Sequence, residues 1–308
     1  MNGAFTSAWP NTLTLHAIPA PYSRLNPAGM SWQSPGQLVR GVLVNELGKA
    51  ALGFTRTLGH AGVHLQVGAS GARKPTAFLG SVTFRDPRDF RTALLKDKIG
   101  LGMLFDAVPG RLETAEEMQH SIDVGRQTGR LASVQFLLSS DVASALVDYT
   151  QAFVARGVHE AYGLEAQPLR AEGAGCSAFS MAYLELAGIL APRFRGAWSF
   201  SVRAPEFDAG RPLIGGRKRP MNKVPLVRAA LLRRGWAQTN EPGIEVFGWD
   251  PTRMAEWIQA RCTQAQRDRS ELVLTCGKAH TLVVDARDVR PDARLQSGDY
   301  FGAATLLR

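Results

Sequence analysis

The chain has 308 residues, of which 45% are hydrophobic and 20% charged, and its formal net charge is +9 at pH 7. This composition is ordinary for a soluble globular protein, and the length suffices for one large domain or two modest ones. No stretch approaches the roughly 18 consecutive apolar residues of a transmembrane helix. No signal peptide is recognisable around Pro10, Pro19 and Pro21, so we expect a cytoplasmic location in the producing cell.

The cysteines and the net charge limit the classes of site and partner. Cys176, Cys262 and Cys276 are too few and too scattered for a disulfide framework or a zinc site with paired cysteines. A bridge, if any, would join Cys262 and Cys276, and we expect no metal and no cofactor. The positive charge favours an anionic partner, and nucleic acid, anionic lipid and acidic cell-wall glycopeptide all fit.

Changes in composition predict three regions. Residues 1–36 are rich in Pro, Ser, Asn and Ala, which indicates an irregular arm with Trp9 and His16 as anchors. Residues 37–195 contain the periodic apolar segments of a folded unit. Residues 196–308 form a basic C-terminal extension or subdomain, packed on the first unit or separate from it.

Two neighbouring segments predict a β-hairpin. Alternation along residues 57–67 is typical of a strand with one apolar face. The other face carries His60, Gly62, His64 and Gln66. After a glycine-rich loop, residues 76–84 return as a second strand, which brings Ser81 or Thr83 near His60.

Apolar periodicity and capping signals predict the further helices and strands. For residues 37–54 the pattern fits a strand as well as a short helix. The remaining predictions are a helix at 91–98, an acidic helical stretch at 113–120, a strand at 131–138, a helix that begins after Ser139, an apolar helix at 177–189, helices at 225–234 and 250–261, and strands at 271–275, 281–284 and 300–307.

One cysteine and one histidine have the features of a nucleophile and its base. A turn through Gly173 and Gly175 delivers Cys176 to the start of the apolar helix, where the helix dipole stabilises a thiolate. An imidazole at His60 could form the thiolate–imidazolium pair and later protonate a leaving group. Backbone amides at the helix start could hold an oxyanion. Taken singly, however, a cysteine or histidine of this kind is more often a packed structural residue.

The order of these segments resembles the circularly permuted branch of the NlpC/P60 papain-like superfamily. The likeness rests on Leu58–Leu65, Phe78–Phe84, Lys96–Gly102, Val134–Asp141, Tyr162–Leu164 and Gly175–Gly188. In that branch the histidine strand precedes the cysteine helix, as it does in this chain. The Lnb N-terminal periplasmic domain family is the most similar, and lecithin:retinol acyltransferase-like proteins are more distant. The likeness covers roughly residues 40–190. It implies an α+β fold with an antiparallel sheet packed on the helix that bears the cysteine.

The resemblance implies a role for individual residues. Cys176 is the expected nucleophile and His60 the expected base, with a third polar residue to orient the imidazole. Thr83 matches that position best, and Ser81 and His64 are the alternatives. His64, Gly175 and Ser177 are the expected substrate-binding residues. The chain departs from the family in having Gly175 where an Asn usually precedes the cysteine, and Thr83 where relatives often have Asn or His.

The implied reaction is acyl transfer through a thioester. We expect a cysteine amidase or peptidase that acts on peptidoglycan. Such an enzyme would suit an antibacterial effector that is exported without a signal peptide. Its expected partners are a secretion-system carrier and an immunity protein. The alternatives are a lipid acyl hydrolase or acyltransferase at anionic membranes, and an inactive binding module. Residues 211–234 hold eight basic residues and no acidic one, so they could contact the anionic target or form a solvated surface. No nucleic-acid motif accompanies them.

Overall fold

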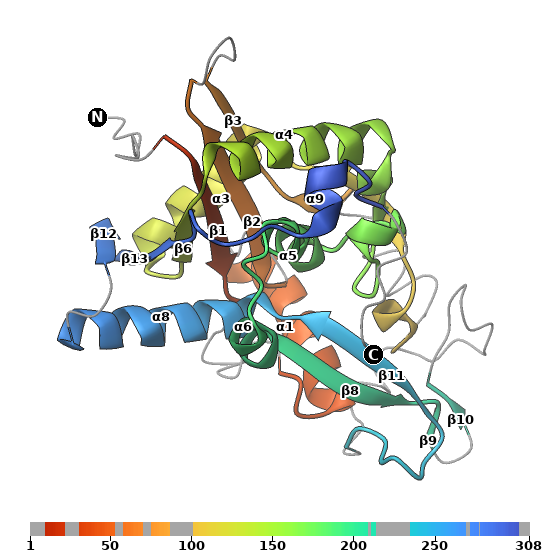
Figure 1. The fold of residues 1–308 in the computed structure, drawn as a ribbon. Helices are drawn as coiled ribbons and strands as arrows, with labels where there is room; N and C mark the ends of the chain where they lie inside the picture. The colour runs from red at the N-terminus through yellow and green to blue at the C-terminus, as the bar shows by residue number, and fades with distance from the viewer. Residues whose placement is uncertain are drawn as a thin grey trace.

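The computed structural model describes residues 10–21, 31–52, 58–69, 75–86, 101–208, 211–213, 235–268, 272–276 and 278–301. The fold is mixed α+β and is built around a six-stranded sheet (Figure 1). Within these ranges, none of the helices combines the length and the apolar character that a bilayer crossing needs.

The six strands lie in the order β12-β13-β6-β1-β2-β3. They are β1 (Thr12–Ile18), β2 (His60–Val67), β3 (Thr76–Gly80), β6 (Ala132–Leu137), β12 (Leu272–Cys276) and β13 (Ala279–Asp285). Neighbouring strands are antiparallel except β13 and β6, which pair in parallel. The sheet is therefore mixed rather than antiparallel as predicted.

The N-terminal region holds a central strand of this sheet. β1 pairs with β2 on one side and with β6 on the other, and Leu13, Leu15 and Ala17 are completely buried. The prediction of an irregular arm over residues 1–36 is wrong for this segment. Its alternating polar and apolar residues are the pattern of a strand, and pairing on both sides satisfies its backbone groups.

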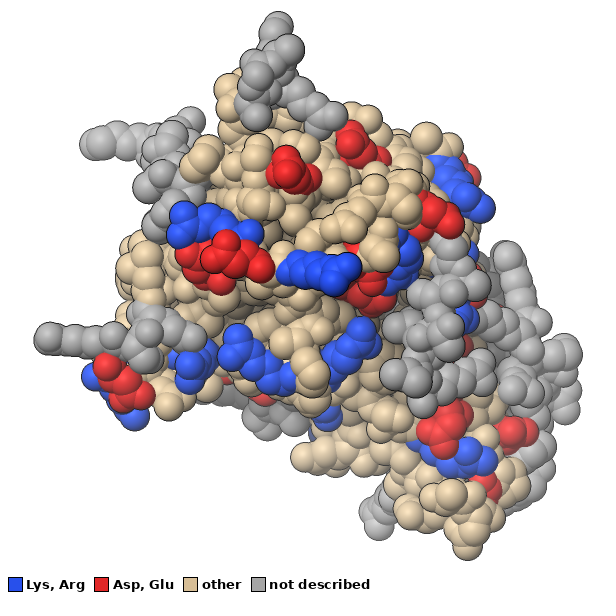
Figure 2. Space-filling model, in the orientation of Figure 1, with Lys and Arg blue, Asp and Glu red and all other residues tan. Residues whose placement is uncertain are grey.

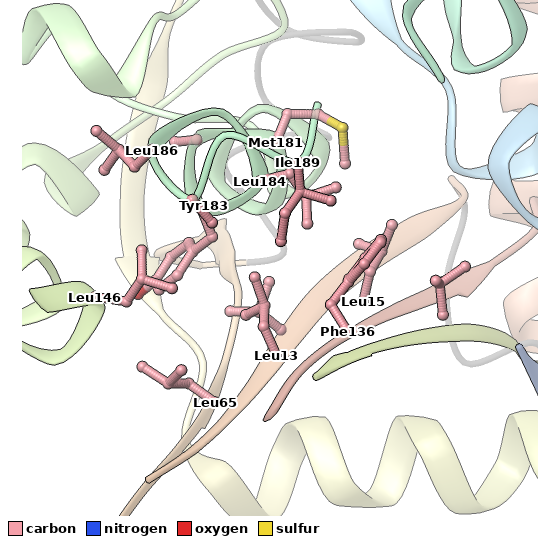
Figure 3. Packing of buried hydrophobic residues seen from close by; sticks show 14 of the residues in the cluster. Leu13, Leu15, Leu65, Phe136, Leu146, Met181, Tyr183, Leu184, Leu186 and Ile189 are labelled. Carbon is pink, nitrogen blue, oxygen red and sulfur yellow. The ribbon is translucent and has the colours of Figure 1, made fainter. Parts of the chain in front are cut away.

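Helices lie on both faces of the sheet. They are α1 (Pro35–Leu52), α3 (Ala115–Thr128), α4 (Ser140–Ala155), α5 (Cys176–Leu186), α6 (Pro192–Trp198), α8 (Pro251–Asp268) and α9 (Ala293–Ser297). On one face, Leu13 and Leu65 from the strands pack with Leu146 of α4 and Leu184 of α5 (Figure 3). On the other face, α3 forms a smaller cluster around Met118.

The C-terminal segments belong to the same core as the central ones. Ile258 and Cys262 of α8, Leu282 of β13 and Leu295 of α9 are buried in the cluster that contains α5. A boundary at residue 195 therefore does not separate two cores. Cys262 is buried and is not part of a disulfide, so the candidate pair of Cys262 and Cys276 does not form a bridge.

Further described strands lie outside the six-stranded sheet. β4 (Val82–Phe84), β5 (Val108–Leu112) and β7 (Ala161–Tyr162) make a three-stranded sheet, and β8 (Ser199–Pro205) pairs with β11 (Gly243–Trp249). β9 (Phe207–Asp208) pairs with β10 (Arg211–Pro212). The β8–β11 ribbon packs on α1, where Leu38, Val42, Phe200 and Val246 belong to a second cluster. The ribbon extends away from the main sheet (Figure 1).

Several predicted elements are confirmed. The strand over 131–138, the helix that Ser139 caps and the apolar helix that precedes Gly188 are all present. Of the segment 37–54, residues 37–52 belong to helix α1, and the returning strand is interrupted at Ser81. The predicted helices at 91–98 and 225–234 lie outside the described residues, as does most of the basic segment 211–234. Among the described residues, acidic and basic side chains are interspersed on the face in Figure 2.

Candidate active site

Cys176 is the first residue of α5, and two glycines shape the turn before it. Gly173 adopts a φ of +117°, and a Cβ there would lie 2.5 Å from the carbonyl oxygen of Ala161. Gly175 occupies the N-cap, and a Cβ on it would lie 2.9 Å from the carbonyl oxygen of Gly163. Both positions therefore require glycine. Gly175 provides no side-chain cap, which leaves the first amides of α5 open to a ligand.

The predicted meeting of Cys176 and His60 is observed. His60 is the first residue of β2, is 3% exposed, and forms a hydrogen bond with the Cys176 thiol. The backbone amide of the next residue, Ala61, also hydrogen-bonds to the sulfur. The beginning of one strand and the beginning of one helix therefore converge on the thiol.

Glu113 completes the arrangement, although no pattern in the sequence marks it as a partner of His60. Its Oε2 lies 2.6 Å from Nε2 of His60, and both side chains are almost fully buried. Glu113 follows β5 and directly precedes Thr114, the N-cap of α3. Its amide donates to the carbonyl oxygen of Ser81 at 2.8 Å, which fixes the carboxyl group beside the start of β2. Because Nε2 is engaged by the carboxylate, Nδ1 is the nitrogen available to the sulfur.

The three residues considered for the orienting role have other contacts. Thr83 is paired with Arg111 in the β4–β5 ladder. Ser81 donates its hydroxyl to the carbonyl oxygen of Ala61 and so supports the strand rather than the imidazole. His64 lies near His16, where its charge lowers the pKa of that buried histidine. Glu113 corrects the prediction of Thr83 as the residue that orients His60.

The surroundings of Cys176 favour its thiolate. Burial would raise the pKa of the thiol, but the hydrogen bond and charge of His60, the amide of Ala61 and the hydroxyl of Tyr162 together lower it to about 7. An ordinary cysteine titrates near 8.5. These contacts therefore favour the thiolate form of Cys176 over the thiol.

Tyr162 and Ser177 present hydroxyl groups to the sulfur. The Tyr162 hydroxyl and Ser177 Oγ each lie 3.8 Å from Sγ. The Tyr162 ring packs on Phe84, with ring centroids 4.3 Å apart, so its position is fixed by β4 and β7. Ser177 and Gly175 thus lie at the predicted substrate site, whereas His64 does not, and Tyr162 adds a donor that the sequence analysis did not identify.

Cys176 opens into a cavity whose walls are mostly apolar. The walls come from α1, the segment around residues 101–108, the turn before α5 and the end of β11, and they include Trp32, Leu38, Val42, Leu58, Phe84, Met103, Leu104, Tyr162, Leu164, Cys176 and Trp249. A substrate that enters this cavity reaches the sulfur.

Asp250 is a second buried carboxyl group on the wall of this cavity, and its contacts are structural. Its Oδ1 accepts the amide of Thr252 at 2.7 Å at the start of α8, and its Oδ2 accepts the indole N–H of Trp32 at 3.1 Å. Burial raises the pKa of Asp250. The residue joins the start of α8 to the cavity wall.

Across the described part of the chain, no group of three or more His, Cys, Asp or Glu residues has the arrangement of a metal site. The chain matches no protein-family model, and the searches of curated proteins and of solved structures also gave no match.

Proposed function

We propose that this protein is a cysteine hydrolase that works by acyl transfer through a thioester on Cys176. The observation that carries the proposal is the buried series Cys176–His60–Glu113, whose cysteine lines a mostly apolar cavity. A nucleophile, a base and a group that orients the base, each within hydrogen-bond reach of the next, are the parts that nucleophilic catalysis requires.

In the first half of the reaction, the Cys176 thiolate attacks the carbonyl carbon of an amide or ester and a carbon–sulfur bond forms. The oxyanion accepts hydrogen bonds from amides at the start of α5, with the Tyr162 hydroxyl as a further donor. The bond to the leaving group then breaks, and the His60 imidazolium gives that group its proton. Glu113 stabilises the imidazolium throughout.

In the second half, water attacks the thioester. Neutral His60 takes a proton from the water, the carbon–sulfur bond breaks, and the carboxylic acid leaves. The thiolate–imidazolium pair is then restored. An alcohol or amine in place of water would make the same protein an acyltransferase.

Two classes of substrate are candidates for this reaction. The resemblance to NlpC/P60 proteins predicts a peptide amide of peptidoglycan, and delivery as an antibacterial effector depends on that prediction. The apolar cavity beside Cys176 favours the second candidate, an acyl ester or amide of lipid character.

Trapping of the thioester tests the proposed reaction. Wild-type protein and Cys176→Ala are incubated with purified sacculi, with phospholipid vesicles and with simple acyl esters, and the intact protein is analysed by mass spectrometry. The expected result is product release and an acyl adduct on Cys176 in wild type only. Equal turnover by Cys176→Ala, or the absence of turnover with every substrate, would contradict the proposal and favour an inactive binding module.

A further inference from the structure

The cavity beside Cys176 adjoins a second, more polar groove. Leu164, Ala178 and Trp249 line both, so the two meet over the first turn of α5. The polar groove continues along the other side of α5, where Glu185 and Arg195 face each other at 3.5 Å. Cys176 lines the apolar cavity and not the polar groove.

The two halves offer different chemistry to a ligand. On the apolar side, Leu38, Val42 and Leu104 are buried in the cluster under the β8–β11 ribbon and also form the cavity wall. On the polar side, Gln167 carries a buried side-chain oxygen that has no hydrogen-bond partner among the described residues, and Arg170 lies in the same wall. The apolar cavity and the polar groove together therefore suit an amphipathic ligand.

Resting on the proposed hydrolase function, we propose that the apolar cavity binds the hydrophobic acyl group of a fatty ester or amide, while the polar groove takes the leaving group. The acyl group is the part that stays bonded to sulfur after the leaving group departs, so it must fit the cavity that contains Sγ. Its alkyl chain gains binding energy from each methylene removed from water.

The polar groove then serves the second half of the reaction. When the C–O or C–N bond breaks, the leaving group takes the proton from His60 and departs along the groove past Leu164 and Trp249. Water enters by the same route and attacks the thioester, while the acyl chain blocks the apolar side. The carboxylic acid is the product, and the sulfur returns to the thiolate.

Chain-length dependence tests this assignment. Para-nitrophenyl esters of C2, C4, C6 and C8 acids share one leaving group, and kcat/KM is measured for each with the full chain. We expect kcat/KM to rise by about fourfold per methylene until the cavity is filled, the effect that corresponds to burial of one CH2 group. A flat or falling profile would overturn the acyl-cavity assignment.

Two matched variants on α1 locate the effect in the cavity. Val42 and Val39 are both 1% exposed and belong to the same cluster, but Val42 lines the cavity and Val39 does not. Val42→Thr should lower the ratio of kcat/KM for C8 to that for C2 by about tenfold, whereas Val39→Thr should leave this ratio within about twofold. Equal ratios in the two variants would contradict the proposal. Because the ratio compares two substrates on the same protein, a partial loss of folded protein does not change it.

The outcomes separate this inference from the hydrolase proposal. If Cys176→Ala hydrolyses every ester as fast as wild type, or wild type hydrolyses none, the proposed hydrolase is itself refuted. If turnover depends on Cys176 but not on chain length, the hydrolase stands and only the acyl-binding cavity is refuted.

Discussion

The carboxylate of Glu113 lies 2.6 Å from Nε2 of His60, although the two residues are 53 positions apart in the sequence. Both side chains are buried, so the contact is shielded from solvent. The carboxylate fixes the proton on Nε2 and turns Nδ1 toward Cys176, where it can take up the thiol proton. In the proposed mechanism, this contact equips His60 to act as the base.

Loss of the Glu113 carboxylate should impair the reaction much more than folding. In Glu113→Gln the amide is nearly the same size but carries no charge to stabilise the imidazolium. Its NH2 group can also donate to Nε2 and force the proton onto Nδ1. We expect kcat/KM to fall on the order of 10²–10⁴-fold, the range typical of orienting carboxylates. The measurement is ester hydrolysis by the purified variant, with its melting temperature as a control for folding.

Thr83→Val is the comparison for Glu113→Gln. Thr83 was the orienting residue that the family resemblance implied, but it is paired with Arg111 in the β4–β5 ladder. Valine matches its shape and its preference for strands, so activity should stay within about twofold of wild type. A loss as large as that of Glu113→Gln would show that Thr83 does act on His60.

Replacement of Gly175 should disturb both the turn and the nucleophile. The added Cβ of Gly175→Ala would lie 2.9 Å from the carbonyl oxygen of Gly163, so the backbone must move next to Cys176. We expect a loss of about 1–3 kcal/mol in the free energy of unfolding together with reduced kcat/KM. Gly175→Asn, which restores the residue that usually precedes the cysteine in the resembled family, should be at least as damaging.

Gly196→Ala is the control for that substitution. A Cβ at Gly196 meets nothing within 4 Å, and the residue lies inside α6. Alanine there should stabilise the protein by about 0.5–1 kcal/mol because it favours the helix. The free energy of unfolding is measured by urea denaturation for both variants. If Gly175→Ala and Gly196→Ala change it by the same amount and in the same direction, the role assigned to Gly175 in the turn is wrong.

Asp250 should matter for stability through its two contacts. Asp250→Ala removes the acceptor for the Thr252 amide and leaves the indole N–H of Trp32 without this partner. We expect a loss of about 2–4 kcal/mol in the free energy of unfolding, and a smaller loss for Asp250→Asn, which keeps one acceptor oxygen. If both variants unfold at the wild-type urea concentration, the structural role assigned to Asp250 is wrong.

His16 should make the protein sensitive to acid. Burial, followed by the charges of His64 and Arg126, lowers the pKa of His16 to about 3. In the unfolded chain the His16 imidazole becomes protonated near pH 6.5, whereas in the folded protein it stays neutral until about pH 3. The stability that His16 contributes is therefore complete above pH 6.5 and is lost as the pH falls toward 3. In this window, His16→Gln should reduce the slope of the unfolding free energy against pH by about 1.4 kcal/mol per pH unit. Parallel wild-type and variant curves would contradict this assignment.

The local elements of the cysteine half could be predicted because their signals are local. The Ser139 cap, the glycines before Cys176 and the alternation around His60 each act over a few residues. The central strand β1 could not be predicted in this way. Its seven alternating residues stand in a segment rich in proline, which favours an irregular structure. Its place between β2 and β6 depends on pairing with distant segments, which no local pattern encodes.

The candidate site could be predicted only in part for the same reason. Cys176 and His60 carry chemistry that is recognisable from the residue type, so their meeting could be expected. Glu113 stands before a run of acids in α3, and such a run is typical of a solvated helix start. Its backbone amide bonds to the carbonyl oxygen of Ser81, a residue far from it in the sequence, and its side chain meets His60. A buried carboxylate and a solvated one look the same in a sequence.

The pH dependence of Cys176 alkylation tests the central claim most directly. Iodoacetamide labelling of Cys176 is followed by peptide mass spectrometry from pH 5 to pH 10, with buried Cys262 as the internal comparison. The rate for Cys176 should rise with a midpoint near its pKa of about 7 and exceed that of Cys262, and His60→Ala should move the midpoint upward. A midpoint at the ordinary value of about 8.5 that His60→Ala leaves unchanged would contradict the proposed nucleophile and base.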